Sequence, residues 1–282
     1  MKSLKTIFFC LRSLWHYAFL SLLLSLFLSL SSAQAQNLTK LDFGGEPVPL
    51  SRTEILESLD QELLLLSESK SRIWVSLKRS DRYLPIIEKA LSLQKVPLDF
   101  KFLPLSLTNL APDYRSSNRR GLWRFSENEA RASGLKITKD LDERLDVVAS
   151  SMAAAKAIEG YKKTYGSWTM ALAAFLDPVE LARAVKDGAG ITNFYDLYIS
   201  ENLERNVSVV LAGKILFSDI VAFGYQKSRS WPVVFSSRKQ QAMAMDVKTL
   251  AESFKWDVRT FKDLNPHILG QTVPAGAYVY GP

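Results

Sequence analysis

The sequence contains few of the residues on which metal and thiol chemistry depends. Its 282 residues include one cysteine, Cys10, and two histidines, His16 and His267. Zinc sites take several cysteine or histidine ligands, and a nucleophilic triad takes a histidine as its base. A His/Cys zinc cluster is therefore excluded, and a triad would depend on His267, in a proline-flanked C-terminal segment. We expect His267 to be a surface or capping residue and the chain to hold no metal.

Motifs for nucleotide and nucleic-acid binding are also missing. There is no phosphate-binding P-loop and no glycine-rich dinucleotide turn, so no cofactor is expected. Lys and Arg number 36 against 29 Asp and Glu, a net charge of +7. This charge forms no basic stripe with interleaved aromatic residues, which argues against nucleic acid as a partner. Carboxylates remain as the candidates for acid–base chemistry.

The N-terminus has the three parts of an export signal. Residues 1–12 are basic, residues 18–30 are almost continuously Leu, Phe and Ser, and Ala33-Gln34-Ala35 supplies small residues for cleavage before Gln36. An uncleaved membrane anchor is the alternative, but the apolar run is shorter than the about 20 residues of a span. We therefore expect a periplasmic or secreted protein, with no membrane span after cleavage. Because Cys10 leaves with the signal, the mature chain must be held by its core without disulfides.

Apolar residues recur at helical spacing along most of the remaining chain, which predicts a mainly α-helical fold. Residues 36–50 are polar and resemble a loose leader, and Ser51 with Glu54 resembles a helix capping box. Residues 109–120 are expected to form a loop, and residues 273–279 a strand. The helices are expected over 51–78, 79–94, 126–133, 142–165, 168–175, 178–186, 203–223, 247–254 and 257–264, with a short apolar element at 98–107.

The pattern predicts a helical chain with a small C-terminal appendix. Its 47% of hydrophobic residues suffice for one large core or two modest ones. The expected division is a signal peptide (1–35), a leader and first helix (36–70), a helical domain (71–225), a linker (226–242) and a small α+β module (243–282).

Several segments resemble the lytic transglycosylase family, specifically its membrane-bound murein transglycosylase D type. The similarity extends over roughly residues 70–282, and the order and spacing of its pieces carry the resemblance. It implies a lysozyme-like helical domain of the SLT type. The segments are Arg79–Pro85 with Val96-Pro97 and Phe102–Leu105, Gly121–Phe125, Asp142–Asp146, Tyr165–Trp168 with Ala171–Phe175, and Leu264–His267.

The resemblance implies a chemistry whose central residue is replaced in this chain. Family members cut the glycan strands of peptidoglycan with one Glu that protonates the leaving oxygen, which requires a carboxyl group with a raised pKa. In the family this Glu follows Leu-Pro-x-x and precedes Ser. The matching positions here are Leu107 and Thr108, and leucine has no proton to donate. Glu88 also follows a Leu-Pro-x-x pattern, but it falls on the preceding helix, where a solvated position is expected.

Other positions of the family's cleft also differ. The resemblance places Arg124 where relatives have Gln, Phe175 where they have Tyr, Leu176 where they have Asn, and Asn206 near a late Tyr. Arg119, Arg120 and Arg124 cluster where carboxylates of peptidoglycan stems or anionic glycans would bind, although a solvated basic loop explains them equally well. The candidate substrate-binding residues are Thr108, Gly121, Trp123, Arg124, Phe125, Phe175, Leu176 and Asn206.

Three carboxylates near the expected cleft are compared with the missing acid. Glu127 and Asp177 are weak substitutes for it, and Glu129 lies in the same region as Glu127. We expect each of the three to be a surface or capping group, because nothing in the sequence around it would raise its pKa. Asp146, like Glu143, is expected to stabilise the start of a helix.

Three functions are compatible with these patterns. The first is a non-catalytic envelope protein that binds peptidoglycan glycan strands or holds a partner protein in the inherited groove. The second is an active lytic transglycosylase with a relocated acid. The third is a structural subunit of an envelope complex, with Leu107 and Leu176 filling the groove. The substitutions at the cleft favour the first.

Overall fold

The computed structural model describes residues 40–226, 231 and 237–282. The predicted signal peptide and most of the predicted linker lie outside the described residues. The chain divides into two compact units, of which Lys40–Pro282 is the one described below. Within the described residues, no helix combines the length and apolar character that crossing a bilayer requires.

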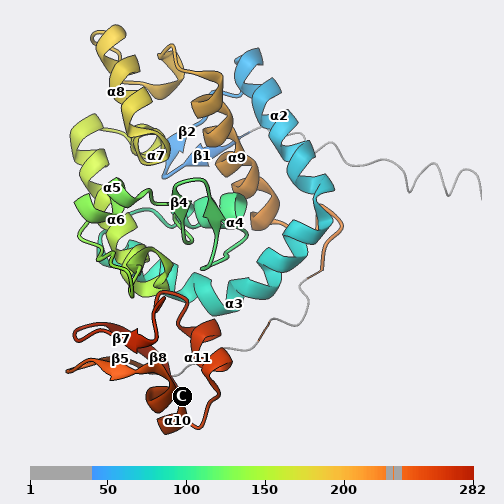
Figure 1. Ribbon diagram of the computed structural model, residues 1–282. Coiled ribbons are helices and arrows are strands. Elements are labelled where there is room, and N and C mark those ends of the chain that lie inside the picture. The colour runs from blue at the N-terminus through green and yellow to red at the C-terminus, as the bar shows by residue number, and fades with distance from the viewer. Residues whose placement is uncertain (1–39, 227–230, 232–236) are drawn as a thin grey trace, which may run out of the picture. The chain divides into compact units, whose positions relative to one another are not determined.

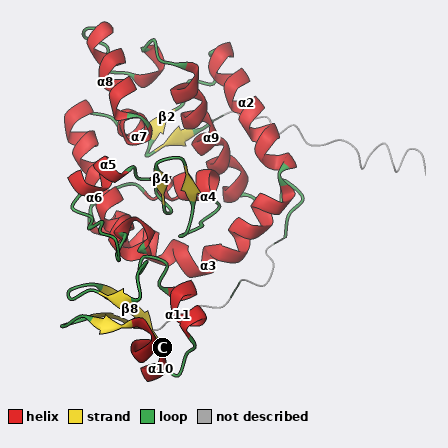
Figure 2. Ribbon diagram, viewed as in Figure 1, coloured by secondary structure: helices red, strands yellow, loops and turns green. Residues whose placement is uncertain are grey.

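Helices account for most of the described unit, which confirms the prediction of a mainly helical fold (Figures 1 and 2). Short 3-10 turns at Leu98–Lys101, Glu143–Leu145 and Phe194–Asp196 connect some of them. The helices are α2 (Thr53–Glu68), α3 (Lys70–Leu93), α4 (Phe102–Thr108), α5 (Glu127–Ala132), α6 (Val147–Tyr165), α7 (Trp168–Leu176), α8 (Pro178–Asp187), α9 (Glu201–Ser218), α10 (Val247–Ser253) and α11 (Val258–Leu264).

The strands are short and pair two by two, all antiparallel. Two hairpins belong to the helical part, and the other two pairs belong to the C-terminal module (Figure 2). The pairs are β1 (Asp42–Phe43) with β2 (Glu46–Pro47), β3 (Arg115–Ser116) with β4 (Arg119–Arg120), β5 (Ser237–Gln240) with β8 (Tyr278–Gly281), and β6 (Met245–Asp246) with β7 (Thr272–Val273).

The first two helices meet at a different residue from the one predicted. The chain breaks at Ser69, and α3 then continues through Arg79, where a new helix was expected. The Ser69 hydroxyl donates to the Leu65 carbonyl at 2.8 Å, a local bond that competes with the helix ladder. The prediction of a capping box at Ser51 is also wrong. The residue that precedes α2 is Arg52, and its side chain makes no capping hydrogen bond.

Residues 40–50 are packed against the helices, so the prediction of a loose leader is wrong for this part. Phe43 is fully buried, and its ring meets that of Phe100 edge to face at 4.9 Å. The Glu46 carboxylate accepts hydrogen bonds from the backbone N–H groups of Trp168 and Thr169 at 2.6 and 2.9 Å. Free N–H groups at a helix start favour such an anion, so the β1–β2 hairpin helps to fix α7.

Helix α7 lies in the interior of the helical part. Residues 171–174 have no exposed surface, and α7 packs against α6, α8 and α9. Close packing also occurs between α4 and α9, where a Cβ added at Gly213 would lie 1.7 Å from the Ser106 hydroxyl oxygen. Small residues at the crossings allow these short distances, as the alanine-rich sequence predicted.

The predicted loop at 109–120 contains the β3–β4 hairpin, which leads into Gly121. Gly121 has φ +75°, and a Cβ there would lie 1.9 Å from the Arg144 carbonyl oxygen. The turn that follows is closed by an isolated bridge between Arg120 and Phe125. This glycine therefore allows residues 121–125 to lie directly against the start of α6.

The C-terminal module has its own core, formed by α10, α11 and the strands, with Leu141 of the helical part packed into it. Strand β5 lies within the predicted linker and pairs with β8. The single strand expected at 273–279 is instead two short strands, β7 and β8, separated by a turn at residues 275–276.

Asp146 joins this module to the helical part. It is buried at the start of α6, and its Oδ1 accepts from the N–H groups of Val148 and Ala149 at 2.9 and 3.0 Å. The Tyr280 hydroxyl donates to the same oxygen at 2.6 Å, and the Arg238 guanidinium donates to Oδ2 at 2.8 Å. Burial alone would raise the pKa of Asp146, but nearby His267 and Arg238, together with the Tyr280 hydrogen bond, outweigh it and hold that pKa below its usual range.

His267 lies inside the same junction, so the prediction of a surface or capping residue is wrong. Its side chain is fully buried, Nε2 donates to the Tyr278 carbonyl at 2.8 Å, and its own carbonyl accepts from Asp142 N–H at 2.8 Å. Burial lowers the pKa of His267, so the ring is neutral at neutral pH. The flanking prolines gave no sign of this burial, because it depends on the packing of β8 against α11.

Replacing Gly121 with Ala is expected to lower the free energy of unfolding by at least about 2 kcal/mol, because the new methyl group meets the Arg144 carbonyl. Gly134→Ala is the matched control: φ is +83°, but nothing lies within 4 Å of the added Cβ. This control should lower the free energy of unfolding by about 1 kcal/mol, because alanine is placed in a left-handed backbone conformation without a steric clash. Urea unfolding measures both, and equal losses would contradict the close approach.

Asp146→Asn is expected to make the protein less sensitive to acid. The folded pKa of Asp146 is below that of the unfolded chain, so its stabilisation is present above about pH 4 and lost as the pH falls through the folded value. Asn still caps α6 but leaves Arg238 unpaired, which should cost about 2 kcal/mol at pH 7. Unfolding curves from pH 7 to pH 3 test this, and parallel pH profiles for the two proteins would refute it.

Candidate functional site

A cavity of about 200 Å³ lies where four segments distant in sequence meet. It is bounded by α4, by the turn after β4, by the junction of α7 and α8, and by the start of α9. Six of the residues that the resemblance placed in the family's cleft line it together, namely Leu107, Trp123, Arg124, Phe175, Leu176 and Asn206, and two further sequence candidates, Arg119 and Asp177, line it as well. The remaining lining residues are Leu103 and Asn202.

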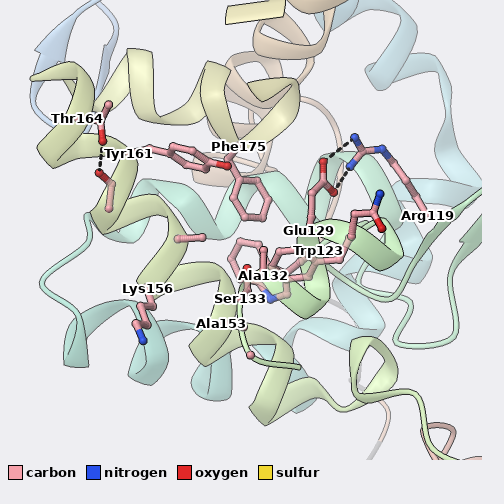
Figure 3. A pocket seen from close by; sticks show the side chains of 15 residues that line it. Arg119, Trp123, Glu129, Ala132, Ser133, Ala153, Lys156, Tyr161, Thr164 and Phe175 are labelled. Carbon is pink, nitrogen blue, oxygen red and sulfur yellow. Dashed lines mark hydrogen bonds and ion pairs between the residues drawn. The ribbon is translucent and has the colours of Figure 1, made fainter. Parts of the chain in front are cut away.

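A larger cavity of about 720 Å³ adjoins the first one, since Arg119, Trp123 and Phe175 line both. Its floor consists mainly of small residues on α5 and α6, with Tyr161 and Lys156 among the larger side chains (Figure 3). The other lining residues are Phe125, Asn128, Glu129, Ala132, Ser133, Gly134, Ala153, Ala157, Gly160 and Thr164. Together the two cavities form what we call the groove.

Three aromatic rings pack together at the groove: Trp123 and Phe175 line both cavities, and Phe125 lines the larger one. Phe175 meets Trp123 and Phe125 edge to face, with ring centroids 5.9 and 5.5 Å apart. The Trp123 indole N–H donates to the Ser151 hydroxyl at 3.0 Å, and its side chain is almost fully buried. The rings are therefore part of the core and expose little surface to the groove.

The side chains of Arg119 and Glu129 meet at the wall of the groove (Figure 3). The two guanidinium Nη atoms lie 3.0 and 3.1 Å from the two carboxylate oxygens, and Arg119 also donates to the Arg124 carbonyl at 2.8 Å. Glu129 accepts in addition from Ser126 N–H at 2.9 Å as half of a capping box. Both carboxylate oxygens of Glu129 are therefore engaged by protein groups.

The other carboxylates considered in the sequence also have structural partners. Asp177 lines the small cavity and caps α8, its Oδ1 accepting from Glu180 N–H at 3.0 Å. Glu127 is exposed, binds Arg131 at 2.7 Å and lines neither cavity. Glu88 binds Lys101 at 2.8 Å and likewise lies outside both.

Arg124 differs from its neighbours in having a strained backbone and an incompletely bonded side chain. Its φ is +54°, a left-handed conformation that non-glycine residues seldom adopt. The guanidinium carbon lies 5.9 Å from the centroid of the Tyr114 ring. Within the described residues its Nε is buried without a hydrogen-bond partner, and its guanidinium is in no ion pair.

Two of the candidate substrate-binding residues lie outside the groove. Thr108 is buried, and its hydroxyl oxygen lies 2.8 Å from the Pro104 carbonyl and 3.1 Å from that of Leu122, so it ties α4 to the following turn. Gly121 allows its own backbone to lie close to the Arg144 carbonyl and lines neither cavity. Phe125 contacts the larger cavity alone. The roles of all these residues in binding stay predictions.

Sequence reasoning missed several residues that line the groove. Asn202 stands four residues before Asn206 on α9, and Lys156 and Gly160 stand four apart on α6. Residues four apart share one face of a helix, so this spacing was the available signal. It identified a face, however, without indicating that the face borders a cavity.

Comparison with known proteins identifies the class of domain that carries this groove. Residues 106–176 match the family described as Transglycosylase SLT domain. The matched stretch runs from α4 to the end of α7 and so includes Leu107, the Gly121–Phe125 turn, and Phe175. The chain thus contains an SLT transglycosylase domain in a mainly helical fold.

Two curated proteins are distant homologues of the chain. Both are named Membrane-bound lytic murein transglycosylase D, from Escherichia coli strain K12 and from Escherichia coli O6:H1 strain CFT073. Each is 23% identical over 208 residues, which is 72% of this chain and 46% of the relative. The chain therefore spans about half the length of the curated relatives it matches.

Proposed function

We propose that this protein is an exported envelope protein that binds peptidoglycan glycan strands in the groove without cutting them. The SLT domain and the distant homology to a lytic murein transglycosylase support the ligand class. The groove supports it further, because two adjoining cavities lined by aromatic, amide and cationic side chains suit a sugar chain.

The observation that carries the proposal is that the carboxylates lining the groove are bound by other protein groups. Among the described residues that line it, these are Glu129 and Asp177. Glu129 is bound by Arg119 and Ser126, and Asp177 caps α8. A general acid must reach the leaving oxygen with its carboxyl group, whereas these carboxylates are directed to Arg119, Ser126 and the start of α8. Leu107, at the position of the family's acid by resemblance, contributes an aliphatic wall.

Purified protein mixed with peptidoglycan sacculi is expected to sediment with them and to release no anhydro-muropeptides. An active lytic transglycosylase on the same sacculi is the positive control for release, measured by liquid chromatography and mass spectrometry. Ala132→Trp, at the edge of the larger cavity, should weaken binding about tenfold by filling the space. Ala182→Trp, exposed on α8 and outside both cavities, is its control and should bind normally.

The outcomes of this assay separate the three functions. Release of anhydro-muropeptides would overturn the absence of cleavage and make the protein an enzyme with a relocated acid. Failure to bind sacculi would overturn glycan recognition and favour a structural subunit or scaffold for an envelope partner. Equal binding by both tryptophan variants would move the binding surface away from the groove.

We further propose that the protein is exported and cleaved after Ala35, which the sequence pattern of residues 1–35 supports. The intact mass of the protein isolated from the host envelope is expected to correspond to a chain that starts at Gln36. A mass that includes residues 1–35 in the membrane fraction would instead indicate a retained anchor.

A further inference from the structure

Arg124 lines the small cavity with a left-handed backbone and with a charge that no described residue balances. A left-handed backbone is unfavourable at a non-glycine residue, and a buried N–H without a hydrogen-bond partner is unfavourable as well. The guanidinium lies over the Tyr114 ring and forms no ion pair with a described residue, so its charge is not balanced by a described carboxylate. Such a combination is typical of a side chain that is completed by a ligand.

The charges around the small cavity indicate that this ligand is an anion. The charge of Arg119 is neutralised by Glu129, whereas Arg124 has no such partner in the described part of the chain. Asp177 lines the same cavity but is joined to Glu180 N–H and makes no ion pair with Arg124. The amide side chains of Asn202 and Asn206 add hydrogen-bonding groups without charge.

The geometry points to Arg124 as a carboxylate-binding residue, so that the small cavity selects glycan strands by an acidic group. This inference rests on the proposed function and names the chemistry of its ligand. A planar guanidinium pairs with a carboxylate through two parallel hydrogen bonds, which a neutral sugar hydroxyl does not match. Relatives, by the resemblance above, have a neutral Gln at this position, so the selection is a property of this chain.

Two sources in peptidoglycan carry such a group. One is the lactyl carboxylate of the muramic acid sugar, which is free only after the stem peptide has been removed. The other is a carboxylate of the stem peptide itself. If the first is the ligand, an amide-cleaving reaction on peptidoglycan must supply it.

Binding is measured by calorimetry on three probes: neutral chitotetraose, glycan strands stripped of their peptides, and strands that keep them. Arg124→Gln is expected to weaken binding of carboxylate-bearing strands by at least about tenfold and to change chitotetraose binding less than about twofold. Arg124→Lys keeps the charge and should lose less than Gln does. The preferred strand, stripped or peptide-bearing, identifies the source of the carboxylate.

Two further variants control for charge and folding. Asp177→Asn retains a capping residue and removes a negative charge from the cavity, so it should tighten binding of the acidic strands. Arg115→Gln removes an exposed cation of the neighbouring strand that lines neither cavity, and should leave binding unchanged. Melting temperatures confirm that each variant is folded.

Two results would overturn the inference, and they differ from failure of the proposed function. If Arg124→Gln bound acidic strands as tightly as the wild type, Arg124 would have no role in recognition. If it weakened all three probes equally, Arg124 would support the groove rather than read a charge. A wild-type protein that bound none of the probes would instead overturn glycan binding as a whole.

Discussion

The close approach of Gly121 to the Arg144 carbonyl is the constraint on which the groove depends. Because no Cβ fits there, the backbone of residues 121–125 can lie against the start of α6. That position brings Trp123 and Phe125 to Phe175 on α7, and it aims Arg124 into the small cavity. The turn at residues 121–125 thus supplies two of the aromatic rings of the groove and the arginine that we propose binds the carboxylate of the ligand.

Electrostatic partners divide the charged residues of the groove into two kinds. Arg119 and Glu129 satisfy each other, and Asp177 is occupied at a helix start, so these groups mainly hold the walls in place. Arg124 differs from these three residues, with a strained backbone and a buried Nε without a partner among the described residues. The same principle applies at Asp146, whose buried charge is matched by Arg238 and Tyr280 and fastens the C-terminal module to α6.

Much of the fold could be predicted because helical periodicity is a local signal. The extents of α5, α7 and α8 differ from expectation by only one residue or so at either end. The break at Ser69 and the packed β1–β2 hairpin were missed, since one depends on a side-chain bond within the helix and the other on contacts with Trp168 and Phe100. Burial of His267 was missed for the same reason, because β8 and α11 enclose it.

The sequence by itself determined the helical class, the SLT segment and the residue types of the groove, because these follow from spacing and motifs along the chain. Only the tertiary structure decided that Leu107, Arg124, Leu176 and Asn206 share one cavity, and that Glu129 is bound by Arg119. The physical reason is that a cavity and its charge balance arise between elements far apart in sequence. A local sequence pattern indicates which face of a helix a residue occupies, but not which residues of other elements lie across the cavity from it.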